Sequence, residues 1–500
     1  MTTVPPNIYE DFLKDQIDKE TATNSLISIL ETSNNVEYRI DCVKYLGKIK
    51  VKDGKVFDVL ENIFISDNNE KVRNVAGNVI KNIFLDKALK PMKWALKHET
   101  SLECLITIIS TLSEIKTNES RRILLHKLKE IEDEKYKYNL KNLIEERNIS
   151  DLSDKEIGEL LINYYIISAL KLKFGYLKFE PNEDGVIINL DLSNVDNQGL
   201  YFSKMAKVFN SIFSLTFLKK LDLSNNNLVK FPVKNAENSY LEVLNLGYNR
   251  IIRLHESFGQ LKQLKELNLK FNRLRSIPKA IESLMNLERL NLRSNKLTKL
   301  PSSLGLLTKL ELLDLHGNNL IDFPFSLEHL DNLRELQLGD NLFNEFPECI
   351  KNFKKLELLG LGRNKISNIP EWIKKLSSLR SLDLYQNNIS QMPTSIGSLT
   401  SLKRLNLRSN KLNSLPTSFF ELSQLKELNL SWNKFKTLPG SLRNLKSLEI
   451  LNLWGNKLTD IPIEIKHLKH LKKIVLNFNN FNNIPETLKT LERKGVVITI

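Results

Sequence analysis

Asp314, His316 and Asp340 are the side chains whose types and spacing come nearest to a catalytic or metal-binding group. An imidazole beside two carboxylates could move a proton or hold a divalent cation. We expect these three residues on neighbouring strands of an open sheet, a surface that excludes little water. The sequence also lacks GxxxxGK[ST], HExxH, CxxC and GxSxG. We therefore predict that the chain is not an enzyme.

Two histidines, His467 and His470, have the spacing of metal ligands on one helical turn. The segment around them offers no third ligand, whereas a protein metal site usually has three or four. Solvated surface histidines are the better interpretation. We accordingly expect no metal site and no cofactor.

A tandem repeat organises most of the chain and must position any functional side chain. Its first position is a leucine in twelve units of 23 residues each, which run without a slip from Leu218 to Arg493. The ninth position is always asparagine, and the fifteenth is proline in every unit except one, which has His255. Apolar residues first alternate and then recur at spacings of three. This predicts one strand, a turn and a short convex-side helical segment per unit.

No single unit can bury its own apolar positions, so stability must belong to the stacked array. The unit that begins at Leu402 illustrates the expected inward positions, which are Leu402, Leu405, Leu407, Leu412, Leu415, Phe419 and Leu422. The ninth-position amide is expected to bond backbone groups of its own and the next unit at a sharp turn. The proline removes a backbone donor where the chain leaves that turn.

This pattern resembles the leucine-rich repeat proteins, whose consensus LxxLxLxxNxLxxIPxxIxxLxx occurs in intracellular, Ras-related scaffold members. The resemblance covers a little over half of the chain. It implies an α/β solenoid, curved, with a parallel sheet on its concave side. It also implies a protein partner, for which a small GTPase or its regulator is a candidate, and hence a role as a scaffold or adaptor in signal transduction.

Residues 1–150 have helical periodicity and little glycine or proline. Two of their segments match each other: Tyr38, Arg39, Cys42 and Leu46 correspond in order to Val72, Arg73, Ala76 and Ile80. With Asp67 ahead of the second copy, this resembles the HEAT repeat, in which an acid, an arginine and a small residue set the stacking of paired helices. We predict an all-α HEAT/armadillo-like domain, with an irregular helical bundle as the alternative.

Four regions follow from these patterns. Residues 1–150 form the helical domain, and residues 151–217 hold a linker helix, a β-hairpin that caps the open edge of the sheet, and a degenerate first repeat. Residues 218–493 form the twelve repeats, and residues 494–500 add a final strand. The linker helix begins at Ser153 with a capping-box pattern, and the hairpin turns at Pro181–Gly185.

Side chains at positions three, five, seven and eight are expected to face the concave side. A basic patch precedes an acidic belt of Asp314, Glu335 and Asp340, and aromatic residues gather at one end, beyond more arginines. Exposed aromatic and arginine side chains are enriched at interfaces. The candidate partner-binding residues are Lys270, Arg289, Arg293, Arg363, Tyr385, Arg404, Arg408, Trp432, Trp454 and Phe478. The position-five column, mostly asparagine, is assigned to structure.

Composition indicates a soluble chain inside the cell. The N-terminus lacks a signal-peptide pattern, no stretch is long and apolar enough to span a membrane, and only three scattered cysteines are present. We expect a cytoplasmic location and no membrane partner.

Residues 201–500 carry 45 basic and 26 acidic side chains, so nucleic-acid binding is the alternative function. The acidic belt and the placement of the aromatic residues at one end argue against it.

Overall fold

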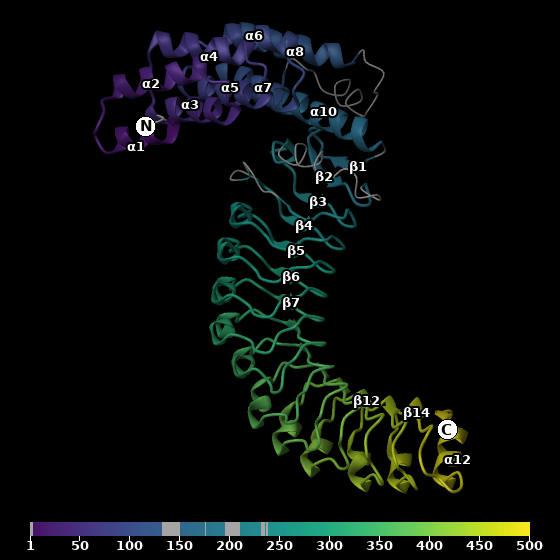
Figure 1. The fold of residues 1–500 in the computed structure, drawn as a ribbon. Coiled ribbons are helices and arrows are strands. Elements are labelled where there is room, and N and C mark those ends of the chain that lie inside the picture. Colours follow the sequence, from purple (N-terminus) through teal and green to yellow (C-terminus); the bar gives the residue numbers. More distant parts are fainter. Residues whose placement is uncertain (1–3, 133–150, 176, 196–210, 232–235, 237–238) are drawn as a thin grey trace. The chain divides into compact units, whose positions relative to one another are not determined.

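The computed structural model describes residues 4–132, 151–175, 177–195, 211–231, 236 and 239–500. The chain divides into two compact units (Figure 1). Unit 1 comprises residues 1–190 with 203–218, and unit 2 comprises residues 191–202 with 219–500. Each is described by itself.

Unit 1 is helical up to a short hairpin. Its helices pack in consecutive pairs such as α2 with α3 and α4 with α5. Asparagine or aspartate caps several N-termini, as Asn35 does by accepting the N–H groups of Glu37 and Tyr38. In the described residues, no helix is both long and apolar enough to cross a membrane. The helices are α1 (Pro5–Leu13), α2 (Lys19–Thr32), α3 (Val36–Ile49), α4 (Gly54–Ser66), α5 (Glu70–Ile83), α6 (Leu89–His98), α7 (Leu102–Ile115), α8 (Asn118–Glu132) and α10 (Asp154–Phe174).

Arginine pairs with acids at matching places along unit 1. Arg39 Nε lies 2.9 Å from an oxygen of Asp67, the residue that ends α4, and Arg73 binds both oxygens of Glu99, which follows α6. Each arginine also donates to a backbone carbonyl six residues before it. Bidentate and carbonyl bonds fix a guanidinium in one orientation. The two arginines singled out in the sequence therefore connect consecutive helix pairs.

The end of unit 1 contains α10 and a hairpin. Ser153 forms a full capping box with Glu156 at the start of α10, as its sequence predicts. The strands β1 (Lys178–Pro181) and β2 (Ile187–Asp191) flank a turn in which Asn182 N–H donates to Val186 O. Inside unit 1, the buried Asn163 of α10 accepts the N–H of Ile187. The helix and the hairpin are thus joined by a side-chain bond.

Unit 2 is a parallel sheet with one short strand from each repeat, stacked in sequence order (Figure 1). Each strand covers positions three to five and pairs in register with the equivalent residues of the next repeat, as Leu382 does with Leu405. The strands are β3 (Lys220–Asp222), β4 (Val243–Asn245), β5 (Glu266–Asn268), β6 (Arg289–Asn291), β7 (Leu312–Asp314), β8 (Glu335–Gln337), β9 (Leu358–Gly360), β10 (Ser381–Asp383), β11 (Arg404–Asn406), β12 (Glu427–Asn429), β13 (Ile450–Asn452) and β14 (Lys473–Val475).

After each strand from β4 to β13 the chain turns and returns through a short 3-10 helix, and after β14 it returns through α12 (Glu486–Arg493). The 3-10 helices are η2 (Glu256–Gln260), η3 (Lys279–Ser283), η4 (Ser302–Leu306), η5 (Phe325–His329), η6 (Glu348–Asn352), η7 (Glu371–Lys375), η8 (Thr394–Ser398), η9 (Thr417–Glu421), η10 (Gly440–Asn444) and η11 (Ile463–His467). A final strand, β15 (Val497–Thr499), pairs with β14 but is shifted by one residue from the 23-residue spacing. Lys473 lies opposite Val497, whereas the repeat would place Val496 there.

The fifteenth position is the N-cap of each of these helices, a more specific role than the sequence suggested. Pro301, for example, has φ −73° and ψ 145° and directly precedes η4. Proline suits this site because its fixed φ starts the helical turn without strain. In the one repeat without proline, His255 Nδ1 accepts the N–H of Ser257 at 3.1 Å. In this repeat a side-chain hydrogen bond caps the 3-10 helix, in place of the proline found in the other repeats.

Leucine, isoleucine and phenylalanine side chains of successive repeats stack into one continuous core. The inward positions predicted for the repeat at Leu402 are confirmed as buried, with Leu415 only partly buried. Full burial of such a side chain contributes about 1.5–3 kcal/mol. Because both neighbouring repeats cover it, this contribution exists only in the stacked array.

The ninth-position asparagines form a buried ladder of hydrogen bonds. Asn364 Nδ2 donates to Leu361 O in its own repeat and to Leu338 O in the preceding repeat, both at 3.0 Å. Its Oδ1 accepts the N–H of Phe343, also in the preceding repeat. The expectation of bonds to the next repeat was therefore wrong in direction. The backbone carbonyl of position six lies just beyond each strand. It accepts from the asparagine side-chain amide of the following repeat, as Leu338 O does from Asn364.

The turn before each ladder asparagine is made by a residue in the left-handed conformation. All twelve position-eight residues have positive φ, between 52° and 70°, although only Gly317 and Gly455 among them are glycine. This conformation costs a non-glycine residue about 1–2 kcal/mol. The turn directs the asparagine inward and leaves the position-eight side chain at the surface.

A column of opposite charges runs along position two. Glu449 accepts from Lys472 at 2.6 Å and from Lys426 at 3.0 Å, and Glu357 likewise lies between Arg334 and Arg380. The two lysine bonds lower the pKa of Glu449 to about 2. This column fixes the relative position of adjacent repeats by charge, in addition to their core contacts.

We expect the stabilising effect of Glu449 to depend on pH. Its native pKa of about 2 lies below the value of about 4.3 for an unfolded glutamate, so the carboxylate stabilises the fold above pH 4.3. This contribution disappears as the pH falls towards 2. The unfolding midpoints of the parent and Glu449→Gln should differ at pH 7 and converge near pH 2. Glu421→Gln, at an exposed acid of η9, is the control and should follow the parent at both pH values.

Candidate binding face

Position-five side chains hold the position-seven residues in place. The Oδ1 atoms of Asn268, Asn406 and Asn452 accept the N–H groups of Lys270, Arg408 and Trp454 at 3.1–3.2 Å. Asp314 and Asp383 make the same bond to His316 and Tyr385. The structural role assigned to this column is confirmed. Its consequence is functional, because these bonds fix the backbone from which the candidate side chains project.

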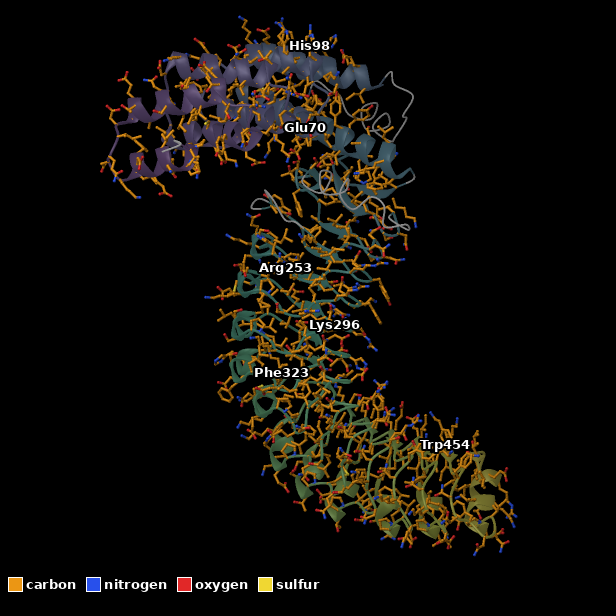
Figure 2. The ribbon with its side chains drawn as sticks, in the orientation of Figure 1. Glu70, His98, Arg253, Lys296, Phe323 and Trp454 are labelled. Carbon is orange, nitrogen blue, oxygen red and sulfur yellow. The ribbon has the colours of Figure 1, made fainter. Side chains whose placement is uncertain are left out.

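Repeats nine to twelve bring four of the predicted residues together as the terminal aromatic cluster: Arg408, Trp432, Trp454 and Phe478. The rings of Trp432 and Trp454 are 5.8 Å apart between centroids, and those of Trp454 and Phe478 are 6.0 Å apart. The Arg408 guanidinium lies 5.9 Å from the Trp454 ring centroid. Figure 2 labels Trp454 in this region. Trp432 is 47% exposed and Phe478 is 75% exposed, so a row of rings faces solvent.

Two other predicted residues lie outside this cluster. Arg404 is exposed on β11, beside Glu427 of β12 in register. Tyr385 is turned towards the middle of the array, where its ring covers Gly362: a Cβ on that glycine would lie only 2.1 Å from the ring. The sequence placed Tyr385 with the tryptophans. The absent side chain at Gly362 explains why it packs elsewhere.

The acidic belt is a packed region in which charges are already paired or sheltered. Asp340 and Arg363 form an exposed ion pair at 3.6 Å. His316 Nδ1 lies where a side chain on Gly339 would begin, 2.7 Å from an ideal Cβ. Asp314 is buried. The grouping that suggested acid–base chemistry is therefore occupied by contacts between neighbouring repeats.

Burial shifts the pKa of two residues in the middle of the concave face, Asp314 and His316. It raises the pKa of Asp314, which the N–H of His316 and the charge of Arg293 partly oppose. Burial also lowers the pKa of His316, and Arg293 adds to that effect. Asp383 has a raised pKa for the same first reason. Burial is thus the largest cause of the pKa shift at each of these three residues.

The basic residues of repeats three and four are where the sequence placed them, with an addition that it missed. Arg289 is exposed on β6, and Arg293 is exposed two residues beyond that strand. Lys270 Nζ lies 5.2 Å from the ring centroid of Tyr248. Tyr248 in turn stacks on Phe271, with centroids 4.7 Å apart and an interplanar angle of 8°. We call Tyr248 and Phe271 the stacked pair.

The stacked pair corrects the expectation that aromatic side chains gather at one end of the face. Tyr248 and Phe271 both occupy position eight and are 49% and 42% exposed. Reading the position-eight column alone would have revealed them, since it contains Tyr248, Phe271, Trp432 and Phe478. Aromatic residues therefore lie among basic residues at both ends of the array.

The conformation of Trp432 leads to a stability prediction. Its φ is 55°, which glycine adopts freely and alanine does not. We expect Trp432→Gly to be more stable than Trp432→Ala by about 0.5–1 kcal/mol, after allowing for the greater entropy of unfolded glycine. Chemical denaturation of both variants measures this difference. Ser381→Gly and Ser381→Ala, within β10, form the control pair, for which alanine should be the more stable.

Family models match much of unit 2. A model described as a leucine-rich repeat region matches residues 367–493, and a second leucine-rich repeat model matches residues 216–274 and 263–320. The chain is a leucine-rich repeat protein. Its repeats, strand spacing and asparagine ladder follow from that membership. No curated protein is significantly similar to it in sequence.

Solved structures share the fold of this leucine-rich repeat protein. An internalin of Listeria monocytogenes is 22% identical, covers 63% of this chain and 90% of its own, and superposes with a TM-score of 0.53. A leucine-rich repeat protein of Leptospira interrogans is 30% identical over 62% of this chain and 95% of its own, with a TM-score of 0.48. A plant peptide hormone receptor, solved in complex with RGF2, is 30% identical over 58% and 53%, with a TM-score of 0.49.

Proposed function

We propose that this protein is a scaffold or adaptor that binds a protein partner on the concave face of repeats nine to twelve. Leucine-rich repeat proteins are commonly protein-binding scaffolds, and the repeat is generally a non-enzymatic interaction domain. The observation that carries the proposal is the exposed row of Trp432, Trp454 and Phe478 with Arg408 against it. Tryptophan and arginine are the residues most enriched at binding hot spots.

Some features of the cluster cost the folded chain free energy. Trp432 and Phe478 occupy left-handed positions where the neighbouring repeat has glycine, Gly455. The indole Nε1 of Trp454 is buried and has no hydrogen-bond partner among the described residues. Each of these features disfavours the fold by roughly 1–2 kcal/mol or more. The left-handed turn is shared by all twelve repeats, so the unpartnered indole N–H of Trp454 is the feature particular to this cluster.

Charge around the cluster indicates the character of the partner surface. Arg404, Arg408 and Lys473 are exposed on or beside β11 and β14, whereas Glu427 is the exposed acid between them on β12. Ile450, 38% exposed on β13, extends the apolar area. A partner that presents apolar or aromatic side chains flanked by carboxylates would complement this surface.

The finer parts of the proposal rest on resemblance. A small GTPase or its regulator is the candidate partner because the consensus is that of the Ras-related scaffold class, and signal transduction is the corresponding process. We further propose that unit 1 is HEAT-like, which the matching Arg39–Asp67 and Arg73–Glu99 pairs support. A cytoplasmic location is proposed from the three unpaired, buried cysteines, Cys42, Cys104 and Cys349.

The test is capture of protein partners by the immobilised full chain at about 0.3 M salt, followed by association kinetics with each captured protein. For a partner of the concave face, Arg408→Glu should lower the association rate at least tenfold, since charge chiefly steers encounter. The control, His329→Ala with Phe325→Ala, removes two exposed side chains of η5 on the other side of the repeats. A partner lost by this control and retained by Arg408→Glu would contradict the proposed face.

A further inference from the structure

A second surface, separate from the terminal aromatic cluster, combines aromatic rings with unopposed positive charge. It consists of positions seven, eight and ten in repeats one to four, which we call the basic–aromatic edge. These positions hold Ser224, Asn225, Asn227, Gly247, Tyr248, Arg250, Lys270, Phe271, Arg273, Arg293, Ser294 and Lys296. Five are cations, two are aromatic and none is acidic. Lys296 is labelled in Figure 2.

The charges on this edge are available to a ligand. Arg250, Arg273, Arg293 and Lys296 are exposed, and Lys270 is partly exposed against the Tyr248 ring. Of the nearby acids, Glu242 at position two pairs with Lys265, and Glu266 is exposed at position three of repeat three. Residues 241–300 contain 12 basic and 5 acidic side chains. A polyanion would therefore meet attraction along the whole edge.

The two rings on this edge project from the left-handed turns that all twelve repeats share. Tyr248 and Phe271 have φ values of 55° and 52°, in the left-handed region. They stack nearly parallel on each other, and both remain partly exposed. Planar groups stack on such platforms, and a cation beside the ring strengthens the contact.

We propose that the basic–aromatic edge binds single-stranded nucleic acid, with bases stacking on Tyr248 and Phe271 and phosphates lying against the flanking arginines and lysines. The rings lie in repeats two and three and the cations in repeats two to four, and three strands at a spacing of about 4.8 Å span roughly 10 Å, the reach of about two nucleotides. An acidic peptide could pair its carboxylates with the cations, but its carboxylates would not stack on the two rings as bases would. The edge borders the acidic belt at Arg293, whose charge acts on Asp314, so the phosphates would lie chiefly against the cations of repeats two and three.

The test uses fluorescence anisotropy of the full chain with a labelled single strand of about a dozen thymidines. Tyr248→Gly with Phe271→Gly should weaken binding at least tenfold, since each stacked base contributes a factor of roughly 5 to 150. Glycine suits both left-handed positions, so the fold should persist. Gln386→Gly, the same change at an exposed left-handed position-eight residue outside both surfaces, is the matched control and should bind like the parent. Lys270→Ala should also reduce the salt dependence, by about one phosphate contact.

Four results would overturn the proposal. They are no binding by the parent chain, equal binding by the Tyr248 and Phe271 double variant, binding of a duplex of the same length as tightly as the single strand, and displacement by polyglutamate as effective as that by unlabelled oligonucleotide. The last result would show an electrostatic surface for acidic proteins. None of them bears on Trp432 and Trp454, so the proposed protein-binding face is tested independently.

Discussion

Replacing Trp432 by glycine and Trp454 by alanine is expected to abolish capture of the protein partner. Truncation of a central hot-spot residue typically removes about 2–4 kcal/mol of binding free energy, and 1.4 kcal/mol is a factor of ten. The two rings touch, so their effects will not add fully. We nevertheless expect affinity to fall at least a hundredfold, measured by biolayer interferometry with a partner that the parent chain captures.

The fold should survive this double change. Trp432 is 47% exposed, and its replacement relieves the left-handed backbone. Trp454 is partly exposed and gives up no intramolecular indole hydrogen bond. The thermal midpoint should therefore remain within a few degrees of the parent. His329→Ala with Phe325→Ala should bind normally, and full capture by the tryptophan variant would remove the terminal aromatic cluster from the binding site.

Asn364→Ala is expected to destabilise the array by about 2–4 kcal/mol. The change deprives Leu338 O and Leu361 O of a donor and the N–H of Phe343 of its acceptor, all in a buried region. A buried polar group left without a partner costs about 1–3 kcal/mol. The position-six carbonyls each retain one bond to another ladder asparagine, which limits the loss. Urea denaturation of the full chain, followed by circular dichroism, measures it.

Two further variants isolate the cause. Asn388→Ala makes the same change at an exposed position-ten residue and should leave stability within about 0.5 kcal/mol of the parent. Asn364→Asp keeps an acceptor but places a carboxylate oxygen against two carbonyls, and should be at least as harmful as Asn364→Ala at pH 7. If Asn364→Ala and Asn388→Ala unfold at the same urea concentration, the ladder does not contribute as argued.

Much of the architecture could be predicted because the repeat makes local and global patterns agree. The leucines at positions one, four and six have one arrangement in which all are buried, and a fixed spacing forces that arrangement on every repeat. The strand in each of the twelve units was predictable for this reason, as were the inward positions of the repeat at Leu402. The helical character of residues 5–132 likewise followed from its apolar spacing.

The proposed binding face was only partly predictable, because surface geometry depends on neighbours that no repeat contains by itself. Arg408, Trp432, Trp454 and Phe478 were correctly placed together, whereas Tyr385 turned towards Gly362 and the stacked pair was missed. An aromatic side chain packs where the adjacent repeat has a small residue, as the Tyr385 ring does against Gly362. That space depends on the particular side chains of the adjacent repeat, which a consensus position does not describe.

The sequence by itself determined the repeat, its strands and its buried positions, since burial of apolar side chains is set by spacing along the chain. Only the tertiary structure decided that position eight is left-handed, that the asparagine amides reach back to the preceding repeat, and that Asp314 and His316 are sheltered and packed. The sign of φ at position eight, the repeat to which each asparagine amide bonds, and the burial of Asp314 and His316 all depend on how closely two repeats lie. That distance exists only after the repeats have stacked.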